Sequence, residues 1–222
     1  MKVILSRKGF DSANGGIVSP IFEDGTMLSF PIPSKEHEKD RIRYADLVCK
    51  GIPLSNILRD LGYKGDECCH LDPDLDGSRR KNPITEWKPA FGQINQSSSY
   101  LINKEIGKGA LFLFFGNFKH IKEVDGKYQY VHRKKTDADE YYGRQFQAIW
   151  EYLQIEDIIS DPEEQKKFFW HPHACEKRLY IESNRKNSAK NGVGIYYAGI
   201  WQELVLKENA ITEEWAKLML EG

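Results

Sequence analysis

The chain has 222 residues, which is enough to bury a sizeable core as one large domain or two small ones. Its 32 basic and 33 acidic residues give a formal net charge of -1, so no global positive field favours nonspecific nucleic-acid binding, although a local basic patch is allowed. Aromatic residues make up 12% of the chain, a share that argues against disorder for its bulk.

The composition also bears on the compartment. No stretch approaches the roughly 20 apolar residues that a membrane span needs, and the first residues lack the apolar region of a signal peptide. Cys68 and Cys69 are adjacent, so the four cysteines do not form the spaced pattern of a secreted disulfide scaffold. We therefore expect a cytoplasmic protein with no membrane partner. The sequence assigns neither a cofactor nor an oligomeric state.

The first predicted strand, Val3-Ile4-Leu5, leads into a polar loop, "SRKGFDSANGG". Cationic groups, hydroxyls and a flexible backbone suit a ligand with phosphate and hydroxyl groups. They come from Ser6, Arg7, Lys8, Ser12 and Gly15. The spacing matches neither a Walker loop nor the GxGxxG fingerprint. The alternative is a solvated turn in which Asp11 bonds to its own backbone.

Two short elements follow this loop. Apolar runs on both sides of Asp24-Gly25 predict a hairpin, and Pro31 and Pro33 argue against a central strand beyond it. Charged residues 34–43 predict a surface loop or short helix. Apolar residues at helical spacing over 53–62 then predict a helix that ends at Gly62.

The stretch "HLDPDLD" carries the first candidate for chemistry. In an extended segment His70, Asp72 and Asp74 alternate, so we expect their side chains to share one face. An imidazole between carboxylates suits metal binding or general acid–base work. The alternative is a surface turn around Pro73.

The middle of the chain predicts a β-rich core. Residues 109–118 form a continuous apolar run, and Asp125-Gly126 marks a hairpin. Residues 144–159 are rich in β formers and read as one or two further strands, with a helix as the alternative. Most of the aromatic side chains here should be core, although exposed ones could sandwich a flipped base. Trp87 and Phe91 are the better candidates for an exposed lining, with Gln93 as a polar ligand-binding group.

The late part predicts a helix that begins after Ser160 or Asp161, strands over 177–183 and 194–206, and a closing helix over 211–220. Within "FFWHPHAC", Pro172 favours an extended backbone that would place His171 and His173 on one side. The two rings could share a metal with Cys175 and with the Cys68-Cys69-His70 run, act as acid–base groups, or be structural. Because the spacing is not that of a zinc finger, we expect no metal.

Taken together, several motifs resemble one family. These are "ILSRKGFDSANGG", "SPIFEDGTMLSFPIP", "HLDPDL", "AFGQ", "GALFLFFGNF" and "WHPH". Their order and spacing, from residue 3 to about residue 206, are similar to those of the third nucleotide-modification-associated domain family. The chain departs from that pattern at Ala110 (usually an acid), at Asn117 (usually an aromatic) and near Tyr100 (usually a histidine). The resemblance implies a role in base modification of DNA in phages and bacteria, and one site shared by the three polar segments.

The order of the central elements is also similar to that of PUA-like barrels of the ASCH and EVE type, which hold a modified or flipped base. We therefore expect a single α+β domain over residues 1–222, with a β-rich, PUA-like barrel core and peripheral helices. This second likeness is an analogy of fold.

The expected function is recognition, and in a stronger form also processing, of a modified nucleotide or base in DNA within a phage or bacterial modification or defence system. The expected partner is a nucleotide or DNA that carries the modified base. The candidate catalytic residues are Asp11, His70, Asp72, His171 and His173. The candidate ligand-binding residues are Ser6, Arg7, Lys8, Ser12, Gly15 and Gln93. The alternatives are an enzyme proper, a transferase or nuclease of that system, and an interaction module with merely solvated loops.

Overall fold

The computed structural model describes residues 1–34, 42–139, 141–174 and 178–182. The strand expected over 194–206, the closing helix and Cys175 lie outside these ranges, as does most of the loop expected over 34–43.

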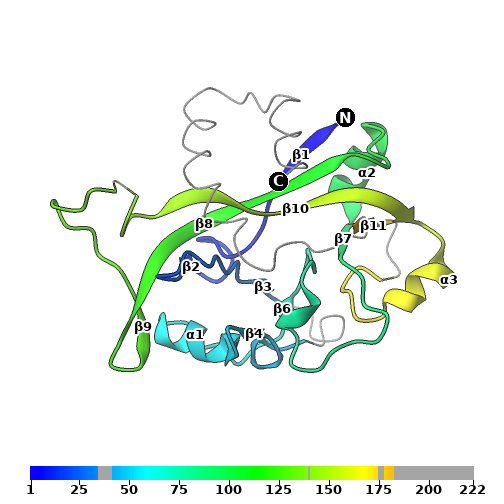
Figure 1. The fold of residues 1–222 in the computed structure, drawn as a ribbon. Coiled ribbons are helices and arrows are strands. Elements are labelled where there is room, and N and C mark those ends of the chain that lie inside the picture. Colours follow the sequence, from blue (N-terminus) through cyan, green and yellow to red (C-terminus); the bar gives the residue numbers. More distant parts are fainter. Residues whose placement is uncertain (35–41, 140, 175–177, 183–222) are drawn as a thin grey trace.

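A seven-stranded sheet forms the main layer (Figure 1). Its strands run in the order β1 (Val3–Arg7), β8 (Leu111–Val124), β10 (Phe146–Ile159), β11 (Arg178–Glu182) and β7 (Ala90–Gln93). Two further strands, β2 (Ser19–Ile21) and β9 (Lys127–Tyr130), also pair with β8. β1 and β2 run parallel to β8, and the other pairs are antiparallel. The first predicted strand is thereby confirmed.

The two longest strands, β8 and β10, lie side by side in this sheet and cross the whole molecule in Figure 1. The apolar run that predicted β8 is buried, and its alternate side chains join two apolar clusters, Phe112 and Phe114 in one and Leu111 and Leu113 in the other. Asp125 and Gly126 both have positive φ and join β8 to β9 as the predicted hairpin. Residues 146–159 form one strand, with an irregularity between Ile149 and Glu151.

The main sheet is open, so the expected barrel core is not found in the described ranges. Within the described ranges the strand order runs from β1 at one edge to β7 at the other without returning. A closed barrel has no such edges. The coarser expectation, a mixed α+β fold with a β-rich core, is confirmed.

Short elements pack below the sheet in Figure 1. They are two small sheets, β3 (Ile32–Pro33) with β6 (Cys69–His70) and β4 (Val48–Cys49) with β5 (Ile52–Pro53), and the helix α1 (Leu54–Asp60). α1 is the predicted helix, and Gly62 follows it at φ +92°. Asp60 accepts a hydrogen bond from the Tyr128 N–H, 3.1 Å away, which ties α1 to β9. The expected turn at Asp24-Gly25 is also present, with its strands reduced to β2 and a single bridge to Met27.

The other helices of the described ranges are α2 (Asn95–Asn103) and α3 (Pro162–Gln165), with single 3-10 turns η1 (Tyr44–Asp46), η2 (Gly77–Arg79) and η3 (Lys166–Phe168). Asp161 caps α3, as predicted, because its carboxylate accepts the N–H groups of Glu163 and Glu164 at 2.9 Å each. None of the helices in the described ranges is both long and apolar enough to cross a membrane.

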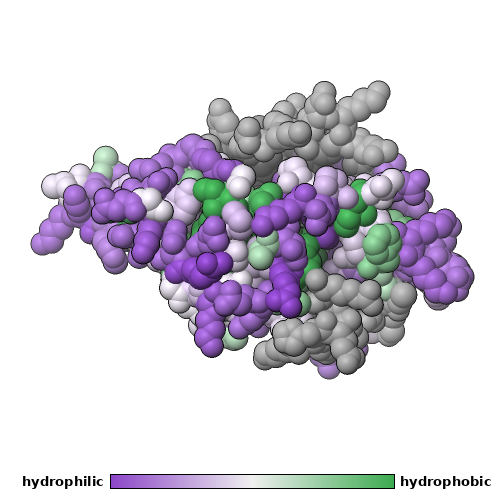
Figure 2. Space-filling view, turned by 90° about the horizontal axis from the view of Figure 1, so that it is seen from below, coloured by the Kyte–Doolittle hydropathy of each residue, from purple (hydrophilic) through white to green (hydrophobic). Residues whose placement is uncertain are grey.

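The aromatic residues mostly form the core. Phe91 is 1% exposed and contacts Phe112, Phe114 and Tyr180, so the expectation that it lines an open surface is wrong. Figure 2 shows a largely hydrophilic face, with hydrophobic residues gathered near its middle and polar ones over the projecting end of the molecule. The aromatic side chains of the central strands therefore mainly stabilise the fold.

Candidate functional site

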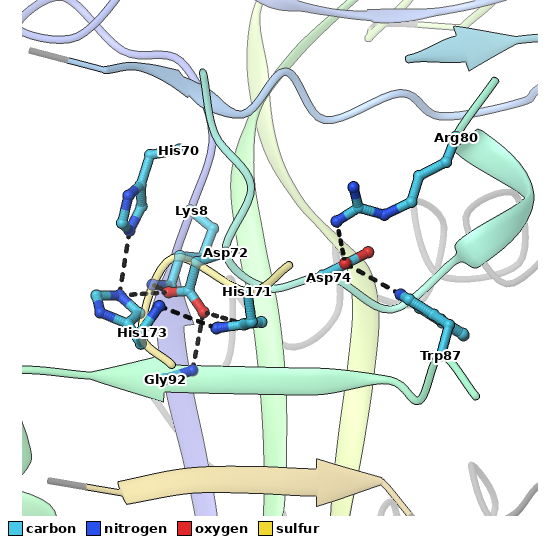
Figure 3. A network of polar contacts seen from close by, with 9 residues as sticks. All are labelled: Lys8, His70, Asp72, Asp74, Arg80, Trp87, Gly92, His171 and His173. Atoms are coloured by element: carbon cyan, nitrogen blue, oxygen red, sulfur yellow. Dashed lines mark hydrogen bonds and ion pairs between the residues drawn. The ribbon is translucent and has the colours of Figure 1, made fainter. Parts of the chain in front are cut away.

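A buried carboxylate, Asp72, stands at the centre of a polar cluster (Figure 3). Its side chain is 1% exposed, and its Oδ2 lies 2.7 Å from the Lys8 Nζ. Its Oδ1 accepts the Gly92 backbone N–H at 2.8 Å. A charge buried this deeply requires such partners, because an isolated carboxylate is strongly disfavoured away from water.

Three segments bring these groups together. Lys8 follows β1, and its N–H continues the strand by donating to the Phe115 carbonyl at 2.9 Å. Asp74 exchanges two backbone hydrogen bonds of 2.9 Å with Ala90, the first residue of β7. This pairing runs residues 72–74 antiparallel to residues 90–92, which sets Asp72 opposite Gly92.

A fourth segment adds two histidines to the cluster. The His171 Nε2 lies 3.5 Å from the Asp72 Oδ1, and the His173 Nε2 lies 3.6 Å from its Oδ2. The His173 Nε2 is also 3.1 Å from the Nε2 of His70, at the end of β6. A Cβ at Gly92 would lie 2.4 Å from the His173 Cβ, so only glycine lets β7 pass this ring.

A turn, and not the expected extended backbone, brings His171 and His173 to Asp72. Their segment is a turn after η3, in which His171 donates to the Phe168 carbonyl at 2.8 Å and Ala174 donates to the His171 carbonyl at 3.0 Å. The expectation that both rings face one side is confirmed, whereas the expected extended backbone is wrong. The two rings face one side because the turn packs against β7, and not because side chains alternate along a strand.

The electrostatics favour an ionised Asp72. Burial alone would raise the pKa of its carboxyl, but the Lys8 ammonium and the imidazoles of His171 and His173 hold that pKa well below its usual range. The Lys8 ammonium also lies 4.6 Å from the centre of the buried Phe91 ring, a cation–π contact that fixes the side chain from a second direction.

The hydrogen bonds constrain the histidine protons. The His173 backbone N–H donates to the His171 Nδ1 at 3.2 Å, so that nitrogen carries no proton. In its neutral form His171 then carries the proton on Nε2, directed at Asp72. Between His70 and His173, the two facing Nε2 atoms can share only one proton.

Asp11 and Arg7 contact other groups of the opening loop, not the Asp72 cluster. The Asp11 Oδ1 accepts the backbone N–H groups of Ala13 and Asn14 at 2.9 and 2.8 Å, which is the Asx turn considered as the alternative. The half-exposed Arg7 Nη2 lies 3.6 Å from the Asp11 Oδ2. Gly15 has φ +88°, and a Cβ there would overlap the Phe10 ring, so packing already requires this glycine.

The other predicted binding residues lie on the opening loop, β1 and β7. Ser12 is exposed in the opening loop, Ser6 is partly buried on β1, and Gln93 is partly buried at the end of β7 beside Gly92. Among the predicted residues, the structure therefore joins Lys8, His70, Asp72, His171 and His173 by direct contacts.

The expectation that Asp74 shares one face with His70 and Asp72 is wrong. Asp74 does not join the histidines, because its Oδ2 lies 2.6 Å from the Arg80 Nη2 and accepts the Trp87 indole N–H at 3.1 Å. Figure 3 shows this second group standing apart from the Asp72 cluster. Only Cys69–His70 is a strand here, so alternation does not extend to residue 74.

Gly92 belongs to the cluster but was not among the candidate residues predicted from the sequence. A glycine inside an otherwise apolar strand, "AFGQ", is typical of a close approach by another part of the chain, and this was the available signal. Phe91 had been assigned to an exposed lining, and its contact with Lys8 follows from its burial instead.

One set of side chains in the described ranges has the donor types of a metal site. The His70 and His173 ring nitrogens and a carboxylate oxygen of Asp72 lie within 4.8 Å of one another. Cys69, which was considered with them, points the other way into the core and is fully buried. The expectation of a metal-free site stays a prediction.

A family model described as nucleotide modification associated domain 3 matches residues 2–216. The chain belongs to this family. The match confirms the resemblance seen in the motifs and ties the protein to nucleotide modification. No curated protein and no solved structure matches the chain. Within this domain, the role of each residue therefore has to be argued from the geometry described above.

Proposed function

We propose that this protein recognises a modified nucleotide or base in DNA and processes it at the Asp72 cluster, within a phage or bacterial DNA-modification or defence system. The observation that carries the proposal is the convergence of Lys8, Asp72 and three histidines from three separate segments in a chain of a nucleotide-modification family.

Stability alone is a poor reason for such a cluster. Replacing a buried ion pair with apolar residues of similar volume is often neutral or stabilising. Perturbed carboxyl pKa values and clustered titratable groups are instead concentrated at functional sites. The low pKa of Asp72 in a fully buried position fits that pattern.

The proposed roles follow from exposure. His70 is only partly buried, whereas Asp72, His171 and His173 are buried, so His70 is the histidine that would meet the nucleotide. His173 would link it to Asp72, and Lys8, His171 and Gly92 would hold the carboxylate in place. On the opening loop, Arg7, Ser6, Ser12 and the Gly15 backbone would contact phosphate or sugar, Asp11 a ribose hydroxyl or base edge, and Gln93 the base from β7.

Processing is favoured over recognition alone. A reader of the PUA-like type holds its base between aromatic walls, but Phe91, the ring that contacts Lys8, is buried in the core. A set of acid–base groups around a carboxylate suits an enzyme, for which transferase and nuclease are the two candidate classes.

Ligand binding by matched variants tests the proposal. Binding of nucleotides and short oligonucleotides, each with unmodified and modified bases, is measured by isothermal calorimetry for the wild type, for His70→Ala and Arg7→Ala, and for His132→Ala. His132 is an exposed histidine beyond β9 and serves as the control. We expect at least one modified ligand to bind, with affinity reduced about tenfold or more, or about 1.4 kcal/mol, by the first two changes only. Equal binding by all four proteins would contradict the proposed site.

A further inference from the structure

We infer that the His70 Nε2, the His173 Nε2 and a carboxylate oxygen of Asp72 bind one first-row divalent transition-metal ion. The inference deepens the proposed function and rests on it for the role of the metal, which would be the reaction centre for the nucleotide. It departs from the metal-free site expected from sequence spacing, because the donor atoms converge in a way that spacing does not reveal.

The separations between the donor atoms suit a single ion. Two ligand atoms that each lie about 2.1 Å from a metal are about 3.0 Å apart at a right angle and about 3.6 Å apart at 120°. The two observed neighbours of the His173 Nε2 match these values, with the His70 Nε2 at 3.1 Å and the Asp72 Oδ2 at 3.6 Å.

The third separation requires a small adjustment. All three donor atoms lie within 4.8 Å of one another, whereas two ligands on opposite sides of an ion are about 4.2 Å apart. The ligand atoms close this gap if His70 moves by about half an ångström, and its partial exposure leaves room for such a rotation.

The second observation is how Asp72 is supported. Ligating carboxylates and imidazoles are held in orientation by further hydrogen bonds, and these supports are part of a functional metal site. Here the Gly92 N–H fixes Oδ1 at 2.8 Å, and Lys8 fixes Oδ2 at 2.7 Å. The buried His171 Nε2 has no hydrogen-bond partner among the described residues and is directed at the same carboxylate from 3.5 Å.

The donor set indicates the kind of ion. Two imidazoles and one carboxylate suit zinc, iron, manganese or cobalt, whereas magnesium and calcium favour all-oxygen sites. Three protein ligands also leave coordination positions for water or substrate, as in catalytic sites. Because Lys8 already balances the charge of Asp72, a bound dication would leave the site positive and therefore suited to a nucleotide phosphate.

Metal binding by the untagged 222-residue chain tests the inference. The protein is purified without chelator and its metal content measured by plasma mass spectrometry. After stripping with 1,10-phenanthroline and dialysis, it is titrated with Co²⁺ and followed by visible absorption. We expect one ion per chain in the wild type and in the control His132→Ala. In His70→Ala and His173→Ala the Kd for Co²⁺ should rise at least about tenfold.

The variants remain informative if one of them unfolds. His70 is partly exposed, so His70→Ala should keep the wild-type circular dichroism even if His173→Ala does not. The inference is overturned if the wild type binds no Co²⁺ at 1 mM, or if folded His70→Ala binds it as tightly as wild type. If nucleotides still bind to the metal-stripped protein, the metal has no part in nucleotide binding, and the proposed function stands without it. Metal binding without any nucleotide binding would support the metal site and reject the proposed function.

Discussion

The Lys8–Asp72 pair is the residue-scale feature on which the cluster depends. The side chains are 16% and 1% exposed, so their attraction is weakly screened by water. The Lys108–Asp157 pair offers a contrast, because its atoms are 3.0 Å apart but its side chains are 71% and 55% exposed. Two ion pairs of similar length in one chain should therefore differ greatly in their effect on stability.

Lys8→Met tests this difference. Removing the ammonium leaves a buried carboxylate without its main charged partner, and we expect the free energy of unfolding to fall by about 3–5 kcal/mol. The matched change Lys108→Met should lower it by about 1 kcal/mol or less, because that pair is exposed. Urea unfolding at neutral pH measures both. Similar losses in the two variants would mean that water reaches Asp72 in solution.

At the scale of elements, the α3–η3 segment is what carries the two histidines to β7. Phe168, in η3, is 6% exposed and packs with Ala90 of β7 and Ile181 of β11. Gln165 in α3 donates to the Ile159 carbonyl at 2.9 Å and so attaches the helix to the end of β10. These contacts fix where the chain turns before His171.

Phe168→Ala tests whether this anchoring positions the site. Replacing a buried phenylalanine costs about 3–5 kcal/mol of stability. It should also weaken Co²⁺ binding several-fold, although Phe168 belongs to no ligand set, because the turn that holds His173 loses its support. The neighbouring change Phe169→Ala is the control, since Phe169 is 74% exposed. Unfolding curves and Co²⁺ titrations measure the two effects. Loss of stability with unchanged Co²⁺ affinity would show that the turn is held from elsewhere.

Local signals account for what the sequence predicted at this scale. The Asp161 cap, the Asp125-Gly126 hairpin and the apolar run of β8 each depend on neighbours in the chain, and each was predicted correctly. The backbone at Pro172 was not, because the turn there is set by packing of η3 against β7. Asp74 was likewise assigned to the histidine face, although the Arg80 and Trp87 side chains hold it elsewhere.

At the scale of the whole molecule, the cluster joins residues from 8 to 173. The motifs supplied most of its members, since Lys8, His70, Asp72, His171 and His173 were all named as candidates. Their arrangement around one carboxylate depends on long-range strand pairing, above all the meeting of residues 72–74 with β7. No local pattern encodes that pairing, and the same limit explains why the strand order suggested a barrel that the described strands do not close.

This long-range assembly makes a prediction for the stability of the entire fold. The three proposed ligands come together only in the folded chain, so a metal bound there should stabilise folded over unfolded protein. At a free Mn²⁺ concentration of 100 times Kd the gain is about 2.7 kcal/mol. For a chain of this length that corresponds to a rise in Tm of roughly 5–11 °C. Mn²⁺ is the appropriate probe, because it binds less tightly than zinc to cysteines exposed on unfolding. Differential scanning calorimetry of metal-stripped protein, with and without Mn²⁺, measures the shift. His173→Ala should show little or none, and an equal rise in that variant would mean that the ion stabilises the protein at some other site.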